Sequence, residues 1–131
     1  MSDDRPVLYV EDEPLLREFA AVILEDAGFE VVTVENGAAA FLALDEKREP
    51  FCAMVTDVNL GDGPDGWAVA KHGRVLNRDL PVVYVTGAGG QQWQDEGVPN
   101  SLLVTKPFTP AQILQAIRSV LGDTAKRGSE P

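Results

Sequence analysis

Short apolar runs alternate with helical segments five times along the 131-residue chain, and this alternation constrains the fold most strongly. Runs of this kind are typical of strands that are buried on both faces of a sheet. We expect strands at Val7–Val10, Glu30–Val34, Phe51–Thr56, Val82–Val85 and Leu102–Val104. Helices are expected between and after them, at Pro14–Ala27, Ala38–Lys47, Trp67–Leu76, Gln91–Glu96 and Pro110–Leu121. A β-α unit that repeats in this way gives a parallel sheet with helices on both faces.

Local signals support the predicted helix ends. Asn36 is placed to cap the second helix and Gly28 to end the first. Thr109 and Gln112 form a capping pair around Pro110 at the start of the last helix. The predicted fold class is therefore α/β, a flavodoxin-like doubly wound (βα)5 domain with a five-stranded parallel sheet in the order 2-1-3-4-5. Residues 1–121 are expected to form this domain, and the polar tail 122–131 to fray.

Composition excludes several classes of function. Lys and Arg total 11 against 21 Asp and Glu, and the net charge of −10 argues against direct binding to nucleic acid or to an anionic membrane surface. One cysteine and one histidine exclude cysteine-based zinc sites and multi-histidine metal sites. No apolar stretch approaches the roughly 20 residues of a membrane span, and the N-terminus is acidic where a signal peptide is basic. We expect a cytoplasmic protein.

Polar side chains follow four of the five predicted strands. Glu11 and Asp12 follow the first, Asp57 the third, Thr86 the fourth and Lys106 the fifth. Ligands of open α/β sheets bind at the carboxyl ends of the strands, so we expect these side chains at one edge.

The chemistry of such a cluster is specific. Three carboxylates held together resist ionising together, and Mg²⁺ relieves their repulsion. A carboxylate such as Asp57 can act as a nucleophile toward phosphorus and form an aspartyl phosphate. Lys106, Thr86 and the metal would share the charge on the phosphoryl oxygens. Because the set contains no strong general base, it suits transfer from an activated phosphodonor.

The ordered set Glu11-Asp12, Asp57, Thr86 and Lys106-Pro107-Phe108 resembles a known family. Over about residues 5–121, the chain is similar to the CheY-like receiver domain of bacterial response regulators. The resemblance implies that Asp57 is the phosphoacceptor and that Mg²⁺ is bound by Asp12, by Glu11, by Asp57 and by the backbone carbonyl of Asn59. It also implies that Thr86 is the switch hydroxyl, that Lys106 pairs with Asp57 and then with the phosphate, and that the Lys106–Pro107 bond is cis.

Three features depart from the family pattern. Leu103 is predicted as the second switch residue beside Thr86, three residues before the lysine, where the family usually has an aromatic ring that moves with the switch threonine. In the loop after Asp57, Gly61 takes the usual place of a proline and Gly66 falls one residue late. The segment between Thr86 and Lys106 is short and rich in glycine, which predicts a short or mobile fourth helix.

The resemblance favours a stand-alone signalling module, phosphorylated by a histidine kinase or a histidine phosphotransfer protein, which switches binding to an unidentified downstream protein. It would be a monomer or weak dimer, and no enzyme beyond catalysing its own phosphoryl transfer and dephosphorylation. One alternative is a receiver-fold binding module that works without phosphorylation, motivated by Leu103 and the altered loop. The other is an aspartyl-phosphate phosphatase, which Asn59 disfavours because such enzymes usually carry a second aspartate there.

Four further residues are interpreted structurally. Cys52 is expected as a buried small hydrophobe and His72 as a solvated residue. Trp67 is expected in the core or at the pocket rim. Trp93 and Val98 are candidates for an exposed partner surface near the fourth helix.

Overall fold

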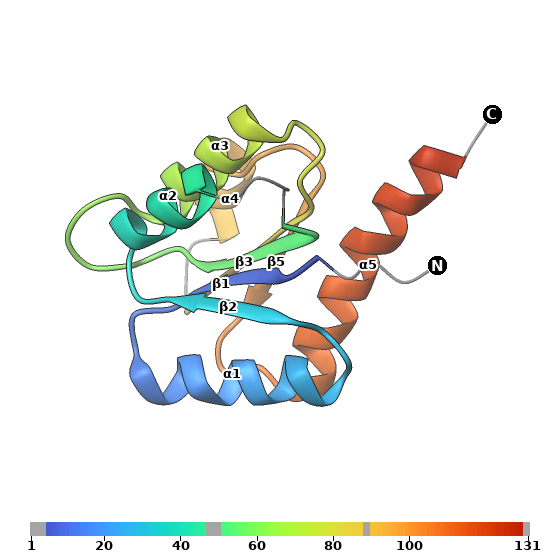
Figure 1. Ribbon diagram of the computed structural model, residues 1–131. Helices are drawn as coiled ribbons and strands as arrows, with labels where there is room; N and C mark the ends of the chain where they lie inside the picture. The colour runs from blue at the N-terminus through green and yellow to red at the C-terminus, as the bar shows by residue number, and fades with distance from the viewer. Residues whose placement is uncertain (1–4, 47–50, 88–89, 130–131) are drawn as a thin grey trace.

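A computed structural model describes residues 5–46, 51–87 and 90–129 of the chain. Five parallel strands form one sheet in the order β2-β1-β3-β4-β5, and helices cover both of its faces (Figure 1). The strands are β1 (Val7–Val10), β2 (Val31–Val34), β3 (Ala53–Asp57), β4 (Val82–Thr86) and β5 (Ser101–Thr105). The helices are α1 (Pro14–Asp26), α2 (Gly37–Glu46), α3 (Gly66–Leu76), α4 (Gly90–Glu96) and α5 (Pro110–Ser129). The predicted fold class and strand order are confirmed.

Two apolar layers hold the sheet between the helices. On one face, residues of α1 and α5 such as Leu24 and Ile117 pack against Tyr9 and Val83. On the other face, residues of α2, α3 and α4 pack against Leu8 and Tyr84 (Figure 1). The central strands β1, β3 and β4 are buried along their whole length, which explains their apolar sequences.

Side-chain caps begin several helices. The Asn36 side chain accepts a hydrogen bond from the Ala39 N–H at 2.8 Å, as predicted. Thr109 and Gln112 exchange two hydrogen bonds at the start of α5, the predicted capping box. Asp65 caps α3 by accepting from the Ala68 N–H at 2.9 Å.

The structure shifts some predicted boundaries. β3 runs from Ala53 to Asp57 instead of from Phe51 to Thr56, and β4 extends by one residue to Thr86, so Asp57 and Thr86 end their strands instead of following them. α5 continues beyond Leu121 to Ser129, because Gly122 has no positive φ and a glycine inside a helix lowers stability without ending it. Fraying of the tail stays a prediction. The predicted end of the second helix at Lys47 lies outside the described residues.

Three structural predictions need correction. His72 is not simply solvated, because its ring stacks on Phe41 with centroids 4.2 Å apart and its Nε2 lies 2.7 Å from an Asp45 oxygen. Val98 is buried within the loop between α4 and β5, and Trp93 is half-buried. Cys52 and Trp67 are buried, as predicted. Within the described ranges, no helix combines the length and apolarity that a bilayer crossing requires.

Candidate functional site

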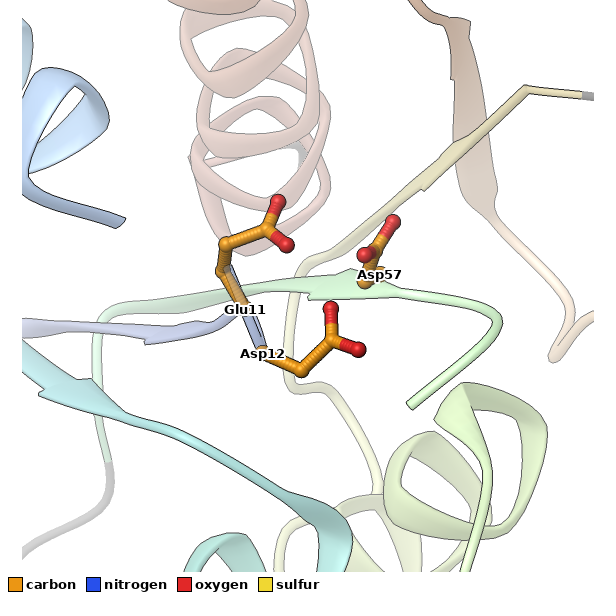
Figure 2. A group of neighbouring side chains, drawn as sticks. All are labelled: Glu11, Asp12 and Asp57. Atoms are coloured by element: carbon orange, nitrogen blue, oxygen red, sulfur yellow. The ribbon is translucent and has the colours of Figure 1, made fainter. Parts of the chain in front are cut away.

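Three carboxylates from β1 and β3 gather at one edge of the sheet. Ligand oxygens of Glu11, Asp12 and Asp57 lie within 4.8 Å of one another (Figure 2). Glu11 directly follows β1, and its N–H still bonds to the Val34 carbonyl at 3.1 Å, which extends the sheet pairing into the site. Glu11 and Asp57 are buried, whereas Asp12 is exposed. The edge therefore presents an acidic cluster that is open to solvent at Asp12.

Lys106 provides the positive charge in this cluster. Its Nζ donates to an Asp57 oxygen at 3.0 Å and lies 3.2 Å from a Glu11 oxygen. The Lys106 N–H bonds to the Thr86 carbonyl at 2.8 Å, which ties the end of β5 to the end of β4. The Lys106–Pro107 peptide bond is cis, as the resemblance implied.

The site carries more negative charge than its lysine neutralises. Burial raises the pKa of Glu11 to about 7, the Glu13 N–H opposes this, and the Asp57 charge adds to it. Burial also raises the pKa of Asp57, although the hydrogen bond from Lys106 opposes the rise. Burial alone would lower the pKa of Lys106, but its contacts with Asp57 and Glu11 raise it. The two buried carboxylates thus resist ionisation until further positive charge is brought in.

The donor set fits a small, hard divalent cation. Closely spaced carboxylate oxygens are the ligands that Mg²⁺ and Ca²⁺ prefer, and the set contains no nitrogen or sulfur donor that would favour a softer metal. A cation held by these oxygens would supply the charge that Lys106 alone does not.

Thr86 and Asn59 border a cleft beside Asp57. In the sheet register, Asp57 stands opposite Val85, so Thr86 ends the strand next to Asp57. Thr86, Asn59 and Trp67 line a cleft of about 500 Å³ between the loops after β3 and β4. The site therefore brings Thr86 close to the carboxylates, while the predicted role of the Asn59 carbonyl stays a prediction.

The loop after β3 is shaped by three glycines. Gly61 and Gly63 have φ of 75° and 90°, in the left-handed region that disfavours side chains. Gly66 packs so tightly that a Cβ there would lie 2.1 Å from the Asp57 carbonyl oxygen. Although Gly66 falls one residue later than in the family pattern, it still allows the start of α3 to approach the end of β3 closely.

The sequence reading missed Arg17. Its guanidinium donates to the Glu11 carbonyl at 2.9 Å from the second turn of α1. The Glu13 N–H also bonds to a Glu11 carboxylate oxygen at 3.1 Å. Both contacts hold the acidic loop in shape. No spacing rule indicates an arginine six residues along the chain from a glutamate as a partner for its carbonyl.

A family model describes residues 7–118, nearly the whole described fold, as a response regulator receiver domain. The chain belongs to this family. In receiver domains generally, an aspartate is phosphorylated and Mg²⁺ is required, and the domain acts as a signalling module. The acidic group Glu11, Asp12 and Asp57 is consistent with both properties.

Individual relatives support the assignment. The chain is 30% identical to the response regulator receiver protein CpdR of Brucella abortus, over 88% of this chain and 95% of CpdR. It is also 30% identical to the phosphate regulon transcriptional regulatory protein PhoB of Escherichia coli, over 89% of this chain but only 52% of PhoB. The chain thus spans about half the length of PhoB.

Solved structures show the same architecture. A response regulator receiver protein from Sinorhizobium medicae superimposes with a TM-score of 0.88 at 34% identity, over 93% of this chain and 98% of that one. The receiver domain of the sensor histidine kinase PA1611 from Pseudomonas aeruginosa, which holds a magnesium ion in its active site cleft, superimposes with a TM-score of 0.78. That pair shares 22% identity over 92% of this chain and 99% of that one, and the likeness shows the fold alone.

Proposed function

We propose that this chain is a phosphoacceptor in two-component signalling and that Asp57 receives the phosphoryl group. The observation that carries the proposal is the convergence of Asp57 with Glu11, Asp12 and Lys106 at one sheet edge. The donor is a phosphohistidine of a histidine kinase or a histidine phosphotransfer protein. The phosphorylated form then binds a downstream protein.

In the transfer step, an Asp57 carboxylate oxygen forms a bond to phosphorus. The phosphorus–nitrogen bond of the phosphohistidine breaks, and the imidazole leaves with the electron pair and takes up a proton. Hydrolysis reverses the loading: water forms a bond to phosphorus, the bond to the Asp57 oxygen breaks, and inorganic phosphate leaves. The chain thus catalyses only its own loading and unloading.

The residues around Asp57 divide the work. Glu11, Asp12 and Asp57, with the carbonyl of Asn59, would hold Mg²⁺, and the bound cation would supply positive charge next to the phosphoryl oxygens. Lys106 already lies 3.0 Å from an Asp57 oxygen and can pair with a phosphoryl oxygen instead. Thr86 at the end of β4 donates its hydroxyl hydrogen to the loaded group.

The donor protein approaches along α1. This helix begins two residues after Asp12 and exposes an apolar stripe of Leu15, Phe19 and Val22, spaced as one helix face. A donor that carries phosphohistidine on a helix must reach the sheet edge that carries Asp57, and its helix can pack against the exposed apolar stripe of α1. Phe19→Ser should slow loading from a phosphotransfer protein and leave loading from acetyl phosphate unchanged. Equal slowing with both donors would refute this route.

The central test is the intact mass of the protein after incubation with Mg²⁺ and acetyl phosphate. The wild type should gain one phosphoryl group, and Asp57→Asn should gain none. Glu25→Gln on the exposed end of α1 is a matched control that should load like the wild type. A wild type that stays unloaded with acetyl phosphate and with a cognate kinase would refute the proposal and favour the phosphorylation-independent binding module. Repeated turnover of phosphate esters would favour the phosphatase alternative.

A further inference from the structure

The Tyr84 and Trp67 rings pack together beside the cleft, where they can transmit a change at Asp57 to other parts of the protein. Leu103 lacks the ring that the family pattern places there, and it packs with the apolar layer of α2, α3 and α4. In the same layer lies Tyr84, two residues before Thr86 on β4 and therefore on the same face of the sheet. Its ring contacts the Trp67 ring, with centroids 4.6 Å apart and planes tilted by 55°.

Trp67 connects this pair to the site. It lies in the first turn of α3, directly after the loop that follows Asp57, and it lines the same cleft as Thr86. A Thr86 side chain that turns toward a phosphoryl group changes the volume of this cleft beside the Trp67 ring. Close-packed aromatic rings can transmit such a change because a densely packed apolar layer has little space to absorb it.

Tyr84 connects the pair to the loop between α4 and β5. Its phenol oxygen accepts a hydrogen bond from the Val98 N–H at 3.0 Å, and both residues are buried. Breaking this bond would leave a buried N–H without a partner, which is unfavourable. When the Tyr84 ring moves, the loop between α4 and β5 should therefore move with it.

From Val98 the contacts continue into α4. The Ser101 hydroxyl donates to the Val98 carbonyl at 2.7 Å, and the Trp93 indole N–H donates to the Ser101 oxygen at 3.0 Å. Trp93 lies on α4, which ends at Glu96. Arg74 on α3 anchors the same loop from outside, because its guanidinium donates to the carbonyls of Pro99 and Asn100. The loop is thus held at one end and coupled to Tyr84 at the other.

We propose that Tyr84 is the positioning residue that couples loading of Asp57 to α4, through Trp67 on one side and Val98 on the other. This inference rests on the proposed function, since it needs a site that is loaded. It assigns to a ring on β4 the task that an aromatic residue at position 103 would otherwise perform.

The two tryptophans of the chain lie at the two ends of this path and permit a direct test. Protein labelled with 5-fluorotryptophan gives one ¹⁹F signal for Trp67 and one for Trp93, and Trp93→Phe assigns them. Mg²⁺ with beryllium fluoride, a stable mimic of a phosphoryl group, should shift both signals in the wild type. In Tyr84→Phe, which keeps the ring and removes the hydroxyl, the Trp67 signal should still shift and the Trp93 shift should be lost. Leu103→Met is the matched control and should keep both shifts.

Each result separates the coupling from the site. A full Trp93 shift in Tyr84→Phe, or its loss in Leu103→Met as well, would overturn the inference. A wild type in which only Trp67 responds would also overturn it and leave the proposed function standing. A wild type that neither responds nor gains a phosphoryl group by mass would overturn both. If Tyr84→Phe does not fold, as judged by urea unfolding, Ser101→Ala tests the next contact, and a retained Trp93 shift would count against the path.

Discussion

Replacing the proposed phosphoacceptor by its neutral isostere should make the metal-free protein more stable. The carboxylate oxygens of the group lie within 4.8 Å of one another, and at that largest separation two unit charges repel by about 3.5 kcal/mol at an effective dielectric constant of 20. Asp57 faces two such carboxylates, Glu11 and Asp12. Its attraction to Lys106 at 3.0 Å amounts to about 5.5 kcal/mol on the same scale. The net Coulomb interaction is therefore repulsive by about 1.5 kcal/mol, and burial of the charge adds to this.

We therefore expect Asp57→Asn to raise the free energy of unfolding by about 1–3 kcal/mol at pH 8 without Mg²⁺. The amide keeps an oxygen that accepts from Lys106, so the gain comes from the removed charge. Urea unfolding followed by tryptophan fluorescence measures the change, with an unchanged dependence on urea concentration as the check on two-state behaviour. Glu25→Gln removes the same charge from an exposed position and should change stability by less than about 0.5 kcal/mol.

Two further conditions sharpen this prediction. Excess Mg²⁺ should stabilise the wild type more than Asp57→Asn, because the wild type offers the cation three carboxylates. At acid pH, where the carboxylates bind protons, the difference between the two proteins should shrink. If Asp57→Asn is equally stable or less stable at pH 8 without Mg²⁺, the ion pair with Lys106 outweighs the repulsion and the reasoning is wrong.

Three other predictions concern pH, the glycine loop and Arg17. The pKa of Glu11 is raised from 4.5 to about 7 and that of Asp57 is also raised, so the folded state holds protons that the unfolded state has lost. The free energy of unfolding of the wild type without Mg²⁺, measured by urea titration, should therefore fall from pH 5 to pH 8. A rise over this range would contradict the directions of the pKa shifts. Gly66→Ala would place a Cβ 2.1 Å from the Asp57 carbonyl oxygen and should lower the free energy of unfolding by about 3 kcal/mol or more. Gly122→Ala has open space around it and should leave the free energy of unfolding unchanged or raise it by up to about 1 kcal/mol. Arg17→Met should weaken Mg²⁺ binding about tenfold in calorimetric titrations, because the Glu11 carbonyl loses its partner. Arg118→Met removes an exposed charge and should leave Mg²⁺ binding unchanged. Equal weakening by both substitutions would assign the effect to net charge.

Much of the site could be predicted because its residues stand directly beside strand ends. Glu11 and Asp12 after β1, Asp57 at the end of β3 and Lys106 after β5 must meet at one edge once the sheet is parallel. The apolar runs indicate which segments are strands, and the caps at Asn36 and Thr109 indicate where helices begin. These signals are local, so the sequence alone carries them.

Contacts between distant segments could not be predicted in this way. His72 is expected to be solvated, but on α3 it contacts Asp45 on α2, which lies 27 residues earlier in the chain. Val98 was considered for a partner surface, but it lies buried with its N–H on Tyr84. Such contacts depend on how two helices or a loop and a strand pack in three dimensions, which hydrophobic periodicity does not specify.

The sequence by itself determined the parallel sheet and the residues that meet at its acidic edge, because alternation and position beside a strand end are properties of neighbouring residues. Only the tertiary structure decided that Arg17 holds the Glu11 carbonyl, that α5 continues past Gly122 to Ser129, and that the Tyr84 hydroxyl meets the Val98 N–H. The contacts of Arg17 and Tyr84 depend on how α1 and the loop before β5 pack against the sheet, and a shift of one helical turn in α1 would give Glu11 another partner.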